Sequence, residues 1–194
     1  LSTGKPRMKK FAFTAILSIQ YLALAIWLGG LVSVAFFAPV TFHQLDPDRF
    51  KAGQIVGGTL KLLGAINVVC GLLLVAGAVG LGFGYRIGRE LSKWRMVLAI
   101  KIILPLIMTA VTVYLVSQVG PRMEVLRKTA QTTDYSQWQG SSKQEFDRLH
   151  ALYTAASQAI LFGGAGLFVV FALESSGQFL VKQQTDSTQS SADE

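Results

Sequence analysis

Long apolar runs separated by short polar segments dominate the hydrophobic pattern of this chain. Four runs reach the roughly 20 helical residues that are needed to cross a hydrocarbon core of about 30 Å. They are Phe11–Val40, Leu62–Phe83, Val97–Val116 and Leu152–Leu173. The pattern therefore predicts an all-α fold, an integral membrane four-helix bundle.

Turn and cap signals set the expected bounds of these helices. Pro39 and the turn Asp46-Pro47-Asp48 are expected to end the first helix, because proline cannot continue the hydrogen-bond ladder. Ser142 and Glu145 fit a capping box that starts the fourth helix before its apolar run. We expect one domain over 11–175, with helices at about 11–42, 55–84, 94–118 and 142–176, and a long third loop over 117–150.

Basic residues gather at one end of the predicted bundle. Residues 1–10 and the loop between the second and third helices are rich in Lys and Arg, whereas the other two loops mix basic with acidic residues. The positive-inside rule therefore predicts that the basic N-terminus and the C-terminus are both cytoplasmic. The polar stretch 182–194 is expected to be a disordered cytoplasmic tail.

Composition narrows the partners and the function classes. Charged residues make up only 15% of the chain, below the quarter that is typical of soluble domains. The net charge of +7 comes from short basic groups rather than a basic stripe, so the expected partner is the lipid bilayer of a bacterial inner membrane, not nucleic acid. No nucleophile–base pair, phosphate loop or nucleotide fingerprint is present, and the single Cys70 excludes an intrachain disulfide.

Small residues recur every four positions in two of the apolar runs. They are Ala76, Gly80 and Gly84 in the second run, and Ala155, Ala159 and Gly163 in the fourth. Such faces let helices approach closely, either inside the bundle or against another membrane subunit or a second copy of the chain.

Few polar residues lie inside the apolar runs: Gln20, Asn67 and Lys101. An ionisable residue at the bilayer centre costs at least about 2.5 to 3.5 kcal/mol, so these positions are where function is sought. Lys101 and Gln20 lie at similar depth and could meet, although a lysine there can also extend to the headgroups. Asn67 is expected to contact a neighbouring helix.

Both histidines are expected at the end of the bundle that faces away from the cytoplasm. His43 follows the first helix and His150 lies near the start of the fourth, with Asp46, Asp48 and Asp147 close in sequence. Imidazole binds Zn, Cu or haem iron and titrates near neutral pH, so a metal or proton site is one hypothesis. The alternative is structural, since Asp147 and His150 are three residues apart on a helix and could bond each other.

Several short motifs resemble one known family. They are Trp27-Leu28-Gly29-Gly30, Phe36, Pro39-Val40, Phe42 and Leu45, followed by Pro121-Arg122, Phe146, Leu149-His150 and Ser157. In this order they are similar to the transmembrane protein 205-like family, four-helix membrane proteins whose domain has no established function. The resemblance spans about 27–174 and implies fold and topology, without a reaction.

A more distant likeness extends to copper-resistance D-type proteins and to bacterial four-helix, haem-binding protoporphyrinogen oxidases. Those oxidases have a Trp and a Gly late in the first helix and a functional lysine in the third, matched here by Trp27, Gly30 and Lys101. They also have a histidine about two turns before the tryptophan. That position is approximately Gln20 here, which speaks against haem ligation and oxidase activity.

Three hypotheses for function remain at this point. The first is a non-enzymatic accessory or binding subunit of a membrane complex. The second is a metal- or haem-binding protein that uses His43 and His150, or Lys101. The third is a small-solute or ion carrier in which Pro105 is a hinge and Lys101 a substrate counter-ion, although no inverted repeat is visible.

Overall fold

A computed structural model describes residues 5–46, 48–85, 91–130 and 138–190. Its helices are α1 (Lys5–Gln44), α2 (Arg49–Tyr85), α3 (Leu91–Tyr114), the π-helical turn η1 (Leu115–Val119), α4 (Gly120–Thr129) and α5 (Ser141–Ser190). No strand occurs in these residues. Four segments are long and apolar enough to cross a membrane, namely Thr14–Gln44, Phe50–Gly82, Met96–Thr129 and Ser141–Glu174. The predicted all-α membrane bundle is confirmed.

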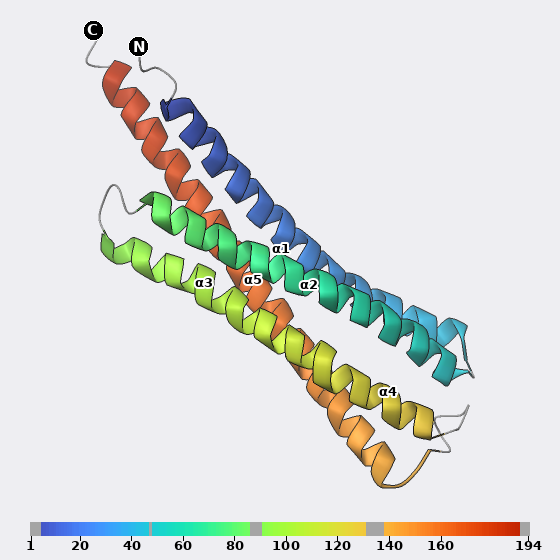
Figure 1. Cartoon of the computed structure of the whole chain (residues 1–194). Coiled ribbons are helices and arrows are strands. Elements are labelled where there is room, and N and C mark those ends of the chain that lie inside the picture. The colour runs from blue at the N-terminus through green and yellow to red at the C-terminus, as the bar shows by residue number, and fades with distance from the viewer. Residues whose placement is uncertain (1–4, 47, 86–90, 131–137, 191–194) are drawn as a thin grey trace.

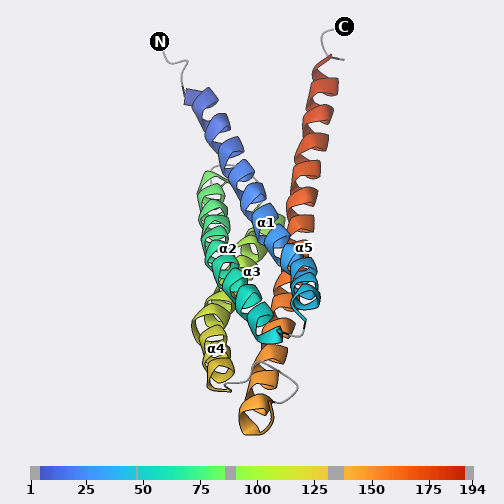
Figure 2. The same ribbon diagram turned by 90° about the vertical axis from the view of Figure 1, so that its right-hand side faces the viewer.

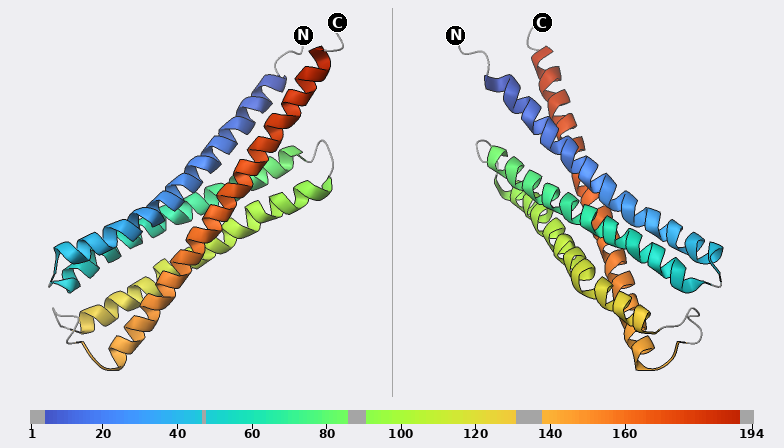
Figure 3. Two further views of the ribbon diagram at one scale, coloured as in Figure 1. Left: turned by 180° about the vertical axis from the view of Figure 1, so that it is seen from behind. Right: turned by 45° about the vertical axis from the view of Figure 1, so that its right-hand side comes forward.

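α1, α2 and α3 lie side by side, each antiparallel to the next, and α5 crosses them at an angle (Figure 1). α2 packs between α1 and α3, and α5 contacts both α1 and α3. Both ends of the chain lie at one end of the molecule, where α1 and α5 spread apart (Figure 2). At the other end, α1 and α2 separate from α4 and α5 (Figure 3). We call this second end the loop end.

Several observed helix bounds differ from those expected. Pro39 lies inside α1, which continues to Gln44. A proline removes one backbone hydrogen bond. The segment still remains helical, because inside a membrane a helix is what satisfies its other backbone N–H and C=O groups. The third span also continues past Ser117, through η1 and α4 to Thr129, so the first part of the expected third loop is helical. Pro121 lies in the first turn of α4, directly after the π-helical turn η1.

The expected C-terminal tail is partly wrong. α5 continues to Ser190, so residues 182–190 are helical rather than disordered. No proline follows Glu174 to interrupt the helix, and Gln, Lys and Ser are tolerated in helices. Residues 191–194 lie outside the described part of the chain.

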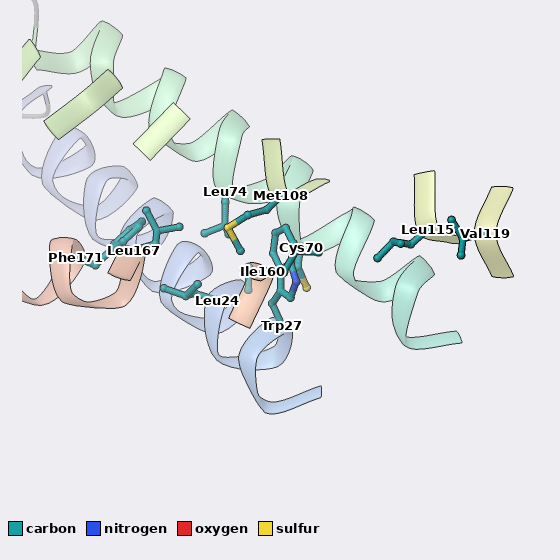
Figure 4. Packing of buried hydrophobic residues seen from close by; sticks show 11 residues of the cluster. Leu24, Trp27, Cys70, Leu74, Met108, Leu115, Val119, Ile160, Leu167 and Phe171 are labelled. Atoms are coloured by element: carbon teal, nitrogen blue, oxygen red, sulfur yellow. The ribbon is translucent and has the colours of Figure 1, made fainter. Parts of the chain in front are cut away.

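The core is centred on Trp27, which is fully buried and lies beside Cys70 and Met108 (Figure 4). Gly71 of α2 makes this packing possible. A Cβ there would lie 2.9 Å from the Trp27 ring and would collide with the Thr109 hydroxyl. The sequence analysis expected close helix contacts at small residues spaced every four positions. Four of these residues, Ala76, Gly80, Ala155 and Ala159, are exposed instead, so they do not make the closest contacts within the bundle.

Candidate functional site

A cavity of about 520 Å³ lies at the loop end, where α1 and α2 separate from α4 and α5. Residues of α1, α2, α4 and α5, together with residues of the connecting segments, line it. Its aromatic lining residues are Phe42, Phe50, Trp138 and Phe146, and its polar ones are His43, Asp46, Arg127 and His150. The cavity therefore combines an apolar wall with a few polar groups, which is the usual composition of a small-molecule site.

Arg127 is the cation of this cavity. Its guanidinium lies over the Phe50 ring, with 5.5 Å from Cζ to the ring centroid, so the two groups make a cation–π contact. The guanidinium also lies close to the backbone of Gly53, since a Cβ added there would lie 3.0 Å from Nη1. Nε of Arg127 is buried and has no hydrogen-bond partner among the described residues. Glu124 does not supply one, since its carboxylate pairs with Lys128 at 2.6 Å.

An aromatic row fixes the opposite wall. The Trp138 ring lies 5.0 Å from that of Phe146, and Phe146 stacks on His150 with 6.1 Å between centroids and an angle of 4°. The Trp138 indole N–H donates to the Ser142 hydroxyl at 3.0 Å, which ties the row to the first turn of α5. Gly140 makes the turn before that helix with a φ of 96°, a conformation that favours glycine.

The cavity brings together His43, Asp46 and His150, three of the residues that the sequence singled out. The other two carboxylates have different contacts: Asp48 accepts the backbone N–H of Lys51 at 3.0 Å, and Asp147 lies 3.6 Å from Lys143. In the part of the chain that is described, no group of three or more His, Cys, Asp or Glu residues is placed to hold a metal ion.

Lys101 has a partner that the sequence analysis did not anticipate. Its ammonium lies 2.6 Å from the Glu174 carboxylate, and the two side chains are only 3% and 7% exposed. The same ammonium lies 4.0 Å from the centre of the Phe171 ring. The contact joins α3 to α5, so Lys101 is an interhelical residue rather than one that extends to the headgroups.

Gln20 does not meet Lys101 but bonds within the α1–α2 interface. Its side-chain amide donates to the Leu74 carbonyl at 3.0 Å, and a Cβ on Gly77 would lie 2.7 Å from it. Among the described residues, Gln20 Oε1, Trp27 Nε1 and Asn67 Oδ1 are buried without a hydrogen-bond partner. These groups form a polar row along α1 and α2 inside the bundle, and Gln20 offers no imidazole for haem at its position.

Comparison with known proteins decides the family. A family model described as a domain of unknown function, DUF4149, matches residues 22–132, more than half of the 194 residues. The chain belongs to the DUF4149 family. The DUF4149 match covers His43, Phe50 and Arg127, and it ends before Trp138 and His150 on the other side of the cavity. No curated protein and no solved structure matches the chain.

Sequence reasoning missed Arg127 because its segment was expected to be a loop. Once residues 120–129 are known to be a helix, Arg127 has a fixed direction and faces α2. The available signal was the pair Gly53 and Gly57 on α2, four residues apart, since both lie within 4 Å of the Arg127 guanidinium once a Cβ is added. Glycines at that spacing leave room for a large side chain from a neighbouring helix.

Proposed function

We propose that this DUF4149 protein is a non-enzymatic binding subunit of a membrane complex, and that it holds a small amphipathic molecule in the cavity at the loop end. The single observation that carries the proposal is the cavity itself. Its volume of about 520 Å³ falls in the range of ligand sites, roughly 300 to 1,000 Å³. Aromatic walls would hold an apolar body, and Arg127 with the histidines would orient a polar end.

The side chains in the cavity favour binding over catalysis. Among the described residues that line it, none is a Ser, Thr, Cys, Tyr or Lys that a neighbouring base could activate as a nucleophile. A metal-dependent reaction would need a third ligand beside His43 and His150. The carrier hypothesis loses the free lysine on which it depended, because Lys101 pairs with Glu174.

The surroundings of the cavity support a membrane role. By the positive-inside rule the loop end faces away from the cytoplasm, and a bacterial inner membrane remains the proposed location. The exposed small residues Ala76 and Gly80, and Ala155 and Ala159, offer faces for a second copy or another subunit. The resemblance to the transmembrane protein 205-like family agrees with this architecture and adds no reaction.

Photo-crosslinking tests whether the cavity is a binding site. The protein in lipid nanodiscs is exposed to three dodecyl probes that carry a diazirine and end in a carboxylate, a hydroxyl or an amine. At least one probe should label residues within 42–46, 50–53, 127–130 or 138–150, where the lining residues of the cavity lie. Ala130→Trp fills the cavity and should remove this labelling, whereas Ala151→Trp, at an exposed site outside it, should not. If Ala130→Trp leaves the labelling unchanged, the proposal is contradicted.

A further inference from the structure

We infer that the ligand of this cavity is an amphipathic anion whose carboxylate or phosphate group pairs with Arg127. The inference rests on the proposed binding function and gives it a ligand class. The anionic group of the ligand is the partner of the Arg127 guanidinium, and the aromatic walls of the cavity contact the apolar part of the same molecule.

Arg127 is positioned to receive an anion. Arg127 is half-buried, and its Nε is buried without a hydrogen-bond partner among the described residues, which is costly for a donor of this kind. Its planar guanidinium carries five N–H donors in a fork that matches a carboxylate or a phosphate. The ring of Phe50 and the backbone of Gly53 already fix the side chain, so little rotamer entropy is lost when the anion binds.

The carboxylates nearby do not occupy Arg127. Glu124 pairs with Lys128, one turn along α4. Asp46 lines the same cavity and has an interaction of its own, and no ion pair between it and Arg127 is found among the described residues. Arg127 therefore remains available to a ligand.

The apolar walls of the cavity favour an anion with an apolar part over a small hydrophilic anion. Phe42, Phe50, Trp138 and Phe146 offer rings to a hydrocarbon or aromatic body. On α1, the large apolar side chains Phe36 and Val40, just before the cavity, are 73% and 53% exposed, so an apolar tail can continue along α1 toward the bilayer. Such a molecule can come from the membrane as an anionic lipid, or from solution as an organic acid.

The charge-matched dodecyl probes test this inference. In the wild-type protein, the carboxylate probe should label residues 127–130 and 138–150 at least about tenfold more strongly than the hydroxyl probe, because charged hydrogen bonds contribute about 1.5 to 3 kcal/mol. Arg127→Gln should reduce carboxylate labelling to the level of the hydroxyl probe, and Arg127→Lys should restore part of it. Arg122→Gln is the matched control, since Arg122 is 58% exposed, lies on the same helix and pairs with Glu145 outside the cavity.

Competition in the wild-type protein tests the inference without any variant and distinguishes the two sources. Phosphatidylglycerol in place of phosphatidylcholine in the nanodisc should reduce carboxylate labelling if the ligand is a lipid. Soluble 1-naphthoate should reduce it if the ligand is an organic acid. If neither competes, or if the carboxylate and hydroxyl probes label equally, the inference is overturned while the binding function stands. If no probe labels the cavity at all, the binding function is overturned.

Discussion

The ion pair of Lys101 and Glu174 joins α3 to α5 inside the bundle. Two opposite charges inside a membrane bundle are tolerated because each compensates the other, and the Phe171 ring contributes a further attraction to the ammonium. Tyr21 of α1 joins the same cluster by donating its hydroxyl to the Phe171 carbonyl at 2.8 Å. Three helices thus meet at one buried polar site, and its energetics can be measured.

Removing one partner of this ion pair should be costly. Glu174→Gln leaves Lys101 buried without a counter-charge, and breaking a buried pair typically costs about 3 to 5 kcal/mol. The double variant Lys101→Met with Glu174→Leu should recover most of that loss. The measurement is the free energy of unfolding in mixed micelles with increasing denaturing detergent. Glu145→Gln breaks the exposed pair with Arg122 and should change little, and an equal loss in both single variants would refute the account.

At the scale of the helices, glycine determines how closely α1, α2 and α3 can pack. Gly71 lies between Trp27 of α1 and Thr109 of α3, where a side chain has no room. Other helical glycines lie in open space: a Cβ on Gly58 or Gly166 would meet nothing within 4 Å. The same substitution should therefore have opposite effects at these positions.

Gly71→Ala should destabilise the bundle by about 1 to 3 kcal/mol, because the added methyl overpacks a filled interface. Gly58→Ala should be neutral or stabilising by up to about 1 kcal/mol, since alanine is the better helix former. Thermal unfolding of the purified protein in detergent, followed by circular dichroism, compares the two variants. If both behave alike, helix propensity rather than packing accounts for the result at Gly71.

The sequence was sufficient for the spans but not for the site. Length and apolar character predicted four membrane helices, since both properties belong to single segments. Residues 117–129 were expected in a loop, whereas η1 and α4 continue the third span through Gly120 and Pro121 to Thr129. Arg127 and the aromatic row acquire meaning only from contacts between segments that are distant in the sequence, and no local pattern encodes those.

At the scale of the whole molecule, the cavity and the chain termini lie at opposite ends. Both termini lie at one end of the molecule (Figure 1). The cavity lies at the loop end, where α1 and α2 separate from α4 and α5. The positive-inside rule predicts that the basic segments are cytoplasmic. The cavity is then expected on the opposite side of the membrane, where a lipid of the outer leaflet or a solute outside the cytoplasm can reach it. Orientation therefore decides which pool of ligand the protein can sample.

Cysteine accessibility measures that orientation. Cys70 is buried at 4% exposure, so a Cys70→Ser background leaves no native thiol to react. Asp48→Cys and Lys128→Cys, exposed at the loop end, should react in intact cells with a maleimide that cannot cross the membrane. Ser190→Cys, at the end of α5, should react only after permeabilisation. The reverse pattern would place Arg127 on the cytoplasmic side and make cytoplasmic anions, rather than external ones, the molecules that can enter the cavity.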